Sequence, residues 1–167
     1  MAAPRVVESE IRVRYAETDA EGVVYYANHF VYMEVARVNY LRALGLNRAL
    51  WDKAGWGIVI IEASCRYHAP AHFDDLLRMR AWVDEVRGSS FAFRYELLNA
   101  ETGQRLAEGR TVQVFVNLHT MRPTRLPPDV RDKLQAEGPG TSGAASPSTL
   151  GAEGPGVSGA TAVSSEA

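Results

Sequence analysis

The chain has 167 residues, of which 46% are hydrophobic and 23% charged, and its formal net charge is −2. These values are typical of one globular domain with a buried core, and the near-neutral charge argues against an extended nucleic-acid-binding surface. The single cysteine, Cys65, excludes an internal disulfide and favours a reducing compartment.

The first residues, MAAPRVVESE, lack the apolar core of a signal peptide. No apolar run is long enough to span a membrane. We therefore expect no membrane span and a cytoplasmic location.

The composition divides the chain into two segments of different character. Residues 136–167 consist mainly of Gly, Ala, Ser, Thr and Pro, and AEGPGTSGA at 136 recurs almost unchanged as AEGPGVSGA at 152. Such a segment cannot bury enough apolar surface to offset the entropy lost on ordering. The sequence thus predicts a folded domain at 1–135 and a disordered tail at 136–167.

The folded part begins with a strand pattern and continues with a helix pattern. Apolar and charged residues alternate over 7–15, which predicts a half-buried strand. Residues 27–45 have helical spacing, with Ala27, Val31, Val38 and Leu41 on one stripe and Gly45 as a natural stop.

Strand alternation returns after the helix in four runs, at 59–67, 77–83, 91–97 and 112–118. RGSS at 87 and NAETG at 99 are typical of hairpin turns, and short connections imply antiparallel neighbours. The expected architecture is α+β, a five-stranded antiparallel sheet wrapped around one long helix. One helix covers only part of such a sheet, so we expect a homo-oligomer.

The loop between the first strand and the helix carries an acid before a glycine. Asp19 precedes Gly22, which allows a tight turn with positive φ, and the apolar VVYY that follows returns the chain to the core. This order brings a carboxylate to a helix start, where unpaired N–H groups gather. Such a pair suits attack on a carbonyl. From spacing alone, a turn or capping aspartate is the simpler interpretation.

A longer sequence match favours the catalytic interpretation of Asp19 over the turn or capping interpretation. The stretch RVRYAETDAEGVVYYANHFVYMEVAR resembles the hotdog-fold acyl-CoA thioesterases of the 4-hydroxybenzoyl-CoA thioesterase family, in particular the Tol-Pal-associated acyl-CoA thioesterases. YHAPAHFDDLLRMRAWV is similar to a second stretch of that family, in which a loop containing proline leads into a strand, and the resemblance covers roughly residues 8–130. The matching residues of the first stretch are Arg12, Val13, Thr18, Asp19, Gly22, Val23, Tyr25, Asn28, Glu34 and Arg37.

The resemblance implies a hotdog fold and hydrolysis of an acyl-CoA without a cofactor. It implies that Asp19 is the catalytic carboxylate, as nucleophile or general base, and that the backbone N–H of Tyr26 binds the thioester carbonyl. It also implies active sites at dimer interfaces, with dimers or tetramers in solution. The substrate-binding residues that we expect are Gly22, Val23, Tyr25, Tyr26, Asn28 and Glu34.

Other polar residues have simpler interpretations. Glu34 falls on the predicted apolar stripe, where it either forms an ion pair, with Arg37 or with a group on the sheet, or lines the pocket as an acid. Cys65 falls on an apolar strand face and is interpreted as a core residue. The histidines show no metal-ligand spacing, so we expect no metal.

Arg66, Arg78 and Arg80 lie on polar strand faces, where solvent exposure is the default, although one or two arginines would help to bind coenzyme A phosphates. A non-catalytic module that binds acyl thioesters is the alternative to an enzyme, and Asp19 argues against it. A hydratase on the same fold is the weaker third interpretation.

Overall fold

The computed structural model describes residues 5–46 and 48–136 of the chain. Apart from Ala136, the predicted tail at 136–167 lies outside the described residues, and its disorder stays a prediction. The main elements in chain order are β1 (Val7–Arg12), α1 (Asn28–Ala43), β2 (Trp56–Tyr67), β3 (Leu76–Val86), β4 (Ser90–Asn99) and β5 (Arg105–Asn117). Four shorter elements were not predicted, namely the 3₁₀ turn η1 (Tyr15–Glu17), α2 (Arg48–Ala54), β6 (Arg122–Pro123) and α3 (Pro128–Gln135).

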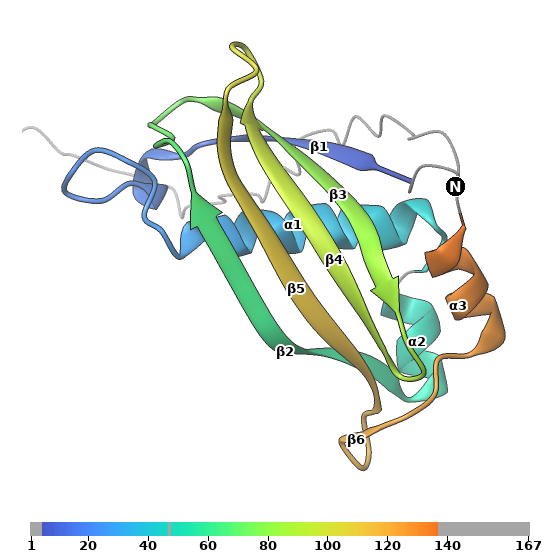
Figure 1. The fold of residues 1–167 in the computed structure, drawn as a ribbon. Helices are drawn as coiled ribbons and strands as arrows, with labels where there is room; N and C mark the ends of the chain where they lie inside the picture. Colours follow the sequence, from blue (N-terminus) through green and yellow to red (C-terminus); the bar gives the residue numbers. More distant parts are fainter. Residues whose placement is uncertain (1–4, 47, 137–167) are drawn as a thin grey trace, which may run out of the picture.

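The strands form one antiparallel sheet in the spatial order β1-β3-β4-β5-β2, and β6 pairs with β5 (Figure 1). The predicted turns at 87 and 99 join β3 to β4 and β4 to β5. One row of directly opposed residues crosses the sheet from edge to edge on the side that faces the helix. It consists of Val7, Ala81, Tyr95, Gly109 and Cys65.

Helix α1 lies along the concave side of the curled sheet (Figure 1). Its buried side chains include Tyr32, Met33, Ala36 and Tyr40, and the Tyr40 ring meets the Phe93 ring edge-on at 5.0 Å. A helix held within a curled antiparallel sheet is the hotdog arrangement, so the predicted fold class is confirmed.

The predicted buried stripe of the helix is wrong except at its end. Leu41 is buried, but Val31 and Val38 are 49% and 41% exposed, and Glu34 is exposed beside them. The physical reason is that α1 has apolar side chains on two faces. Periodicity detects both faces but cannot tell which one meets the sheet.

Strand β2 is an edge strand and is more exposed than its alternating sequence suggested. Its pairing with β5 shifts between Ile60 and Glu62, and Ile61 in this irregularity is 63% exposed. Cys65 packs against the core but is only half-buried, and this burial raises the pKa of its thiol. Its predicted core role is therefore only partly correct.

Candidate active site

The β1–α1 loop folds back on itself around Asp19. The Asp19 N–H donates to the Val23 carbonyl oxygen at 2.9 Å, and the Gly22 N–H donates to the Asp19 carbonyl oxygen at 3.0 Å. Gly22 has φ +78°, the positive value that its position in the sequence predicted. The Val24 N–H then donates to Ala71 at 2.8 Å, which ties the loop to the segment that follows β2.

The Asp19 carboxylate has one oxygen engaged and one available. Its Oδ1 accepts the Glu21 N–H at 3.0 Å, so the interpretation as a turn aspartate is correct for that atom. Within residues 5–46 and 48–136, no hydrogen bond or ion pair reaches its Oδ2. The side chain is half-buried. A carboxylate oriented through one oxygen and open at the other can accept a proton or attack a carbon.

Helix α1 begins without a side-chain cap. The Asn28 and His29 N–H groups donate to the carbonyl oxygens of Tyr25 and Tyr26 at 2.9 and 3.3 Å. No acceptor among the described residues engages the N–H groups of Tyr26 and Ala27. They are the free donors that a helix start offers to a ligand oxygen.

Asn28 does not cap the helix but ties it to the loop. Its Nδ2 donates to the Glu17 carbonyl oxygen at 2.8 Å, and the Tyr25 N–H donates to the same oxygen at 2.9 Å. The rings of Tyr25 and Tyr26 are neighbours at 4.6 Å and are 44% and 59% exposed. The predicted residues Gly22, Val23, Tyr25, Tyr26 and Asn28 thus lie in the turn and helix start that also carry Asp19.

A buried acid that was not predicted from the sequence, Glu17, holds this loop. The Glu17 carboxylate accepts the Arg14 N–H at 2.8 Å, the Arg14 guanidinium at 2.9 and 3.0 Å, and the Tyr32 hydroxyl at 2.9 Å. Burial, followed by this contact with Glu17, raises the pKa of Tyr32. The spacing of three residues between Arg14 and Glu17 could have indicated their ion pair from the sequence. Tyr32 lies 15 residues further along, and only the fold brings its hydroxyl to the Glu17 carboxylate.

Glu34 lies away from the Asp19 turn. It is exposed on α1 and lines a groove of about 250 Å³ together with Arg37, Val38, Trp51 and Ile58. No ion pair joins it to Arg37 in the part of the chain that the structure describes. The predicted pairing is therefore absent, and its predicted place on the buried stripe is wrong.

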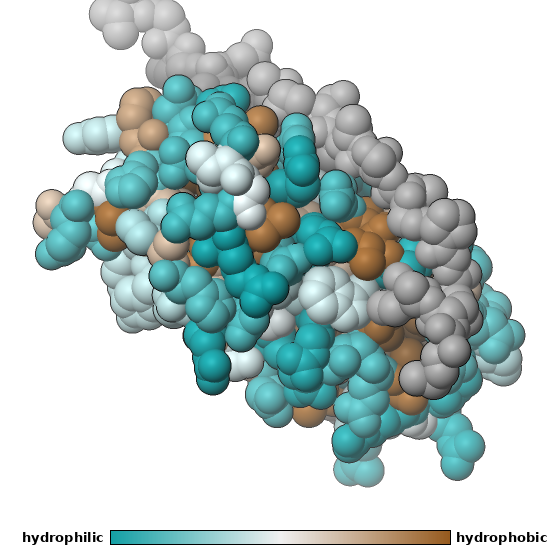
Figure 2. Space-filling model, turned by 45° about the horizontal axis from the view of Figure 1, so that its top comes forward, coloured by the Kyte–Doolittle hydropathy of each residue, from teal (hydrophilic) through white to brown (hydrophobic). Residues whose placement is uncertain are grey.

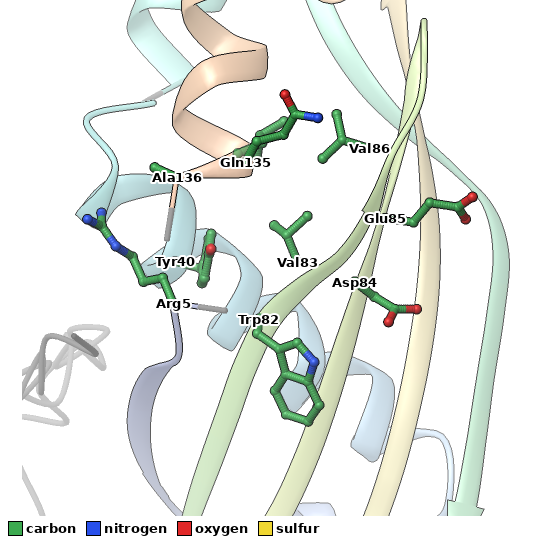
Figure 3. Close-up of a pocket in the computed structure, with 10 residues that line it drawn as sticks. Arg5, Tyr40, Trp82, Val83, Asp84, Glu85, Val86, Gln135 and Ala136 are labelled. Atoms are coloured by element: carbon green, nitrogen blue, oxygen red, sulfur yellow. The ribbon is translucent and has the colours of Figure 1, made fainter. Parts of the chain in front are cut away.

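Two larger hollows lie outside the predicted site. One of about 410 Å³ lies between β3 and α3, where Val83 and Val86 face Gln135 while Glu85 projects from the opposite side of the strand (Figure 3). The other, of about 520 Å³, lies over the outer face of the sheet and includes Arg66. Neither contains Asp19 or the start of α1.

The arginines on the outer face are mostly paired. Arg78 lies 3.9 Å from Glu8 and 3.5 Å from Glu10, and Arg80 lies 2.7 Å from Glu96. These ion pairs agree with the solvated strand faces that were expected. Among the described residues, no three His, Cys, Asp or Glu side chains gather as a metal site would require, and no helix is both long and apolar enough to cross a membrane.

Comparisons with known proteins agree on one family. The sequence model of the Thioesterase-like superfamily matches residues 13–134. The chain is 32% identical over 120 residues to the acyl-CoA thioester hydrolase YbgC of Escherichia coli O6:H1, which covers 72% of this chain and 89% of that protein. It is 33% identical over 123 residues to the acyl-CoA thioesterase YbgC of Haemophilus influenzae, and the match covers 72% of this chain and 88% of that protein.

Solved structures agree as well. A 1,4-dihydroxy-2-naphthoyl-CoA thioesterase from Synechocystis superposes with a TM-score of 0.72 at 26% identity, over 77% of this chain and 95% of that one. A DHNA-CoA thioesterase from Staphylococcus aureus superposes with a TM-score of 0.70 at 30% identity, over 72% of this chain and 80% of that one.

Proposed function

Because this chain belongs to the thioesterase-like superfamily, we propose that it hydrolyses acyl-CoA thioesters at the junction of the β1–α1 loop and helix α1. The chain is a thioester hydrolase, as its named relatives are. The single observation that carries the proposed site is the Asp19 carboxylate, with one oxygen free among the described residues, in the loop that leads to an uncapped helix start.

In the proposed reaction, the thioester carbonyl oxygen accepts the N–H of Tyr26. As the carbonyl carbon becomes tetrahedral, its oxygen becomes an anion that this donor and the positive end of α1 stabilise. When Asp19 acts as a general base, it takes a proton from water as the water oxygen attacks the carbon. The proton then passes to the departing coenzyme A thiolate.

When Asp19 acts as the nucleophile, its free oxygen attacks the carbon and the thiolate leaves. The product is a mixed anhydride, which water hydrolyses to the free acid and the original carboxylate, and the remaining proton passes to the coenzyme A thiolate. Both routes need an ionised Asp19 next to the same oxyanion donor. Within this proposal Gly22 and Val23 form the turn that orients Asp19, Asn28 fixes the helix start, and the Tyr25 and Tyr26 rings contact the acyl-CoA.

Glu34 has a separate role in the proposal. Its groove is lined by apolar side chains, among them Trp51 and Ile58, and by the charged side chains of Glu34 and Arg37. Such a surface suits selection of the acyl group and not the chemical step. We therefore assign Glu34 to substrate preference.

The proposed enzyme is a dimer or a tetramer. Within the described residues, β2 hydrogen-bonds only to β5, which leaves its other edge unpaired beside the exposed Ile60 and Ile61. The neighbouring face of α1 exposes Val31, Val35 and Val38. Figure 2 shows separate hydrophobic patches on one face of an otherwise mainly hydrophilic surface. An unpaired strand edge next to apolar side chains favours association with a second copy.

The oligomer is tested by sedimentation at micromolar concentration, with Ile61→Lys as the perturbed variant. We expect a dimer or tetramer for the natural sequence and dissociation with loss of activity for the variant. A fully active monomer would overturn this part of the proposal. Cytoplasmic location stays a prediction from the sequence.

Hydrolysis of a panel of acyl-CoAs tests the function itself. Short aliphatic, long aliphatic and aromatic acyl-CoAs are incubated with the protein, and release of the free thiol is followed. We expect turnover of at least one class at a rate far above that of the buffer. Tight binding of acyl-CoAs without any thiol release would instead support the non-catalytic binding module.

A further inference from the structure

One backbone carbonyl at the start of α1 is held unusually firmly. The Tyr26 carbonyl oxygen accepts the Tyr67 hydroxyl at 2.9 Å, His29 Nδ1 at 3.2 Å and the His29 N–H at 3.3 Å. Because a carbonyl offers only acceptors, His29 Nδ1 carries the proton in this contact. An ordinary helix-start carbonyl needs only its intrahelical partner, so two side chains are used here beyond what the helix requires.

The two side chains come from different elements and support each other. Tyr67 is the last residue of the edge strand β2, and its ring meets the His29 ring edge-on at 4.8 Å. His29 is only 4% exposed, and burial lowers its pKa, which keeps the ring neutral. Burial, followed by contact with Cys65, raises the pKa of Tyr67 to about 12, so its hydroxyl stays a donor at any ordinary assay pH.

The arrangement has a cost in stability that a purely structural residue would avoid. His29 Nε2 is buried and has no hydrogen-bond partner among the described residues. An unsatisfied buried polar atom is unfavourable, and an apolar side chain of similar size would remove the penalty. A histidine at this position therefore provides something that an apolar residue cannot, namely the hydrogen bond from its Nδ1–H to the Tyr26 carbonyl oxygen.

Holding this carbonyl fixes the neighbouring N–H groups. A trans peptide is planar, and its C=O and N–H point in opposite directions. The Tyr26 carbonyl shares its peptide with the Ala27 N–H, and the Tyr25 carbonyl, which accepts the Asn28 N–H at 2.9 Å, shares its peptide with the Tyr26 N–H. Both peptides that flank Tyr26 are thus fixed, and both of their N–H groups are free among the described residues.

We propose that Tyr67, with His29, is a positioning residue that aims the oxyanion-binding N–H groups of Tyr26 and Ala27 at the substrate carbonyl. The inference rests on the proposed function, since it concerns the same site. Preorganised donors are effective because they need not reorient as charge develops on the oxygen. The donated hydroxyl also polarises the peptide, which strengthens the Ala27 N–H as a donor. Neither side chain touches the substrate in this account.

Tyr67→Phe removes only the hydroxyl and keeps the ring that packs on His29. We expect kcat to fall about tenfold, less than the roughly 10²–10³-fold that loss of an oxyanion donor itself costs, with KM changed less than about twofold. The matched control is Tyr95→Phe, which also loses a buried hydroxyl contact, to Thr111 at 2.9 Å, but one that does not involve the Tyr26 carbonyl oxygen. It should lower the melting temperature and leave kcat unchanged.

His29 supplies the second half of the test. His29→Leu keeps much of the volume and loses the Nδ1 donor, whereas His29→Asn keeps a donor close to that position. We expect kcat to fall in the leucine variant and to recover in large part in the asparagine variant. A structural role alone would predict the reverse order, because leucine removes the unsatisfied Nε2 and suits the buried site better.

The outcomes separate this inference from the proposed function. Normal kcat in Tyr67→Phe, or equal kcat losses in Tyr67→Phe and Tyr95→Phe, would overturn the positioning role. If Asp19→Asn is inactive in the same series, the proposed function survives that result. A fully active Asp19→Asn would instead overturn the proposed chemistry, whatever the Tyr67 variants do.

Discussion

Replacing Glu17 by alanine tests whether its buried carboxylate anchors the loop that carries Asp19. The side chain is 10% exposed and accepts four hydrogen bonds, three from Arg14 and one from Tyr32. Alanine removes all four and leaves the Tyr32 hydroxyl and the Arg14 N–H without this acceptor. The Tyr25 N–H and the Asn28 Nδ2 donate to the main-chain carbonyl oxygen of Glu17, so these two contacts remain.

The expected loss of stability follows from the buried part of this network. The Arg14 side chain is 71% exposed, so its ion pair is screened by solvent and is left out of the estimate. Two charge-assisted bonds remain, from the Arg14 N–H and the Tyr32 hydroxyl, and such bonds contribute about 1.5–3 kcal/mol each. Allowing for water that reaches the exposed loop, we expect a loss of about 2–4 kcal/mol, which lowers the melting temperature by roughly 6–16 °C for a domain of this size.

The assay is thermal unfolding followed by circular dichroism, with kcat measured below the transition. Glu101→Ala is the matched control, because that glutamate is exposed in the β4–β5 turn and makes no side-chain hydrogen bond or ion pair among the described residues. The control should stay within about 0.5 kcal/mol of the natural protein. Glu17→Ala should also lose kcat, since the Asp19 turn is less well held. A melting temperature equal to that of the control would refute the reasoning.

Three further predictions concern other parts of the molecule. Burial lowers the pKa of His29 in the folded state, so below about pH 6.5 the unfolded state binds a proton at this residue more readily than the folded state does. The free energy of unfolding should therefore fall as the pH drops below that value. In His29→Leu this part of the pH dependence, seen in melting temperatures between about pH 7 and 5, should disappear; an unchanged profile would place the titration elsewhere. Glu34→Gln should alter KM or the preference among acyl-CoAs more than kcat, and a kcat loss as large as at Asp19 would contradict its assignment to substrate preference. Ending the chain after Gln135 should leave the melting temperature and activity nearly unchanged, because the composition of 136–167 offers little to pack on the domain; a large loss of either would show that this segment docks.

The fold was largely predictable because its strands alternate clearly and its connections are short. The five strands β1 to β5 and the central helix occur where periodicity indicated, and most of their ends lie within about three residues of the prediction. The exception is β5, which begins at Arg105 although the predicted run began only at 112. The short elements were missed because α2 and α3 span only 7 and 8 residues, too few for a periodic pattern to be distinctive. Their place in the core depends on contacts such as the edge-on pair of Trp51 and Phe115 at 5.8 Å.

The faces of the elements were harder to predict than the elements. On β5 the valines suggested the buried set, but Thr111, Gln113 and Phe115 are buried as well, so both faces of that strand are covered. On α1 two apolar faces compete, and only the Tyr32–Tyr40 face meets the sheet. A single sequence cannot tell a surface that the domain buries from one that a second copy would cover.

The candidate site likewise contains residues that are neighbours in the sequence and one residue that only the fold brings close. Asp19, Gly22 and the helix start lie close together in the sequence, so local turn chemistry together with the family resemblance was enough to propose them as a site. Tyr67 lies 41 residues beyond Tyr26, and its hydroxyl meets that carbonyl only because β2 ends beside the start of α1. No local pattern records such a contact, and only the folded chain shows it.

Steady-state kinetics of Asp19→Asn, with the best acyl-CoA of the panel, test the central claim most directly. The amide oxygen can still accept the Glu21 N–H, so the turn should persist, and Glu21→Gln in the same loop is the control of equal charge change. An amide is neither a base nor a useful nucleophile, so kcat should fall by roughly 10²–10⁴-fold while KM and the melting temperature change little. A folded Asp19→Asn protein that turns over substrate as fast as Glu21→Gln would contradict the account and redirect the search to Glu17 and Glu34.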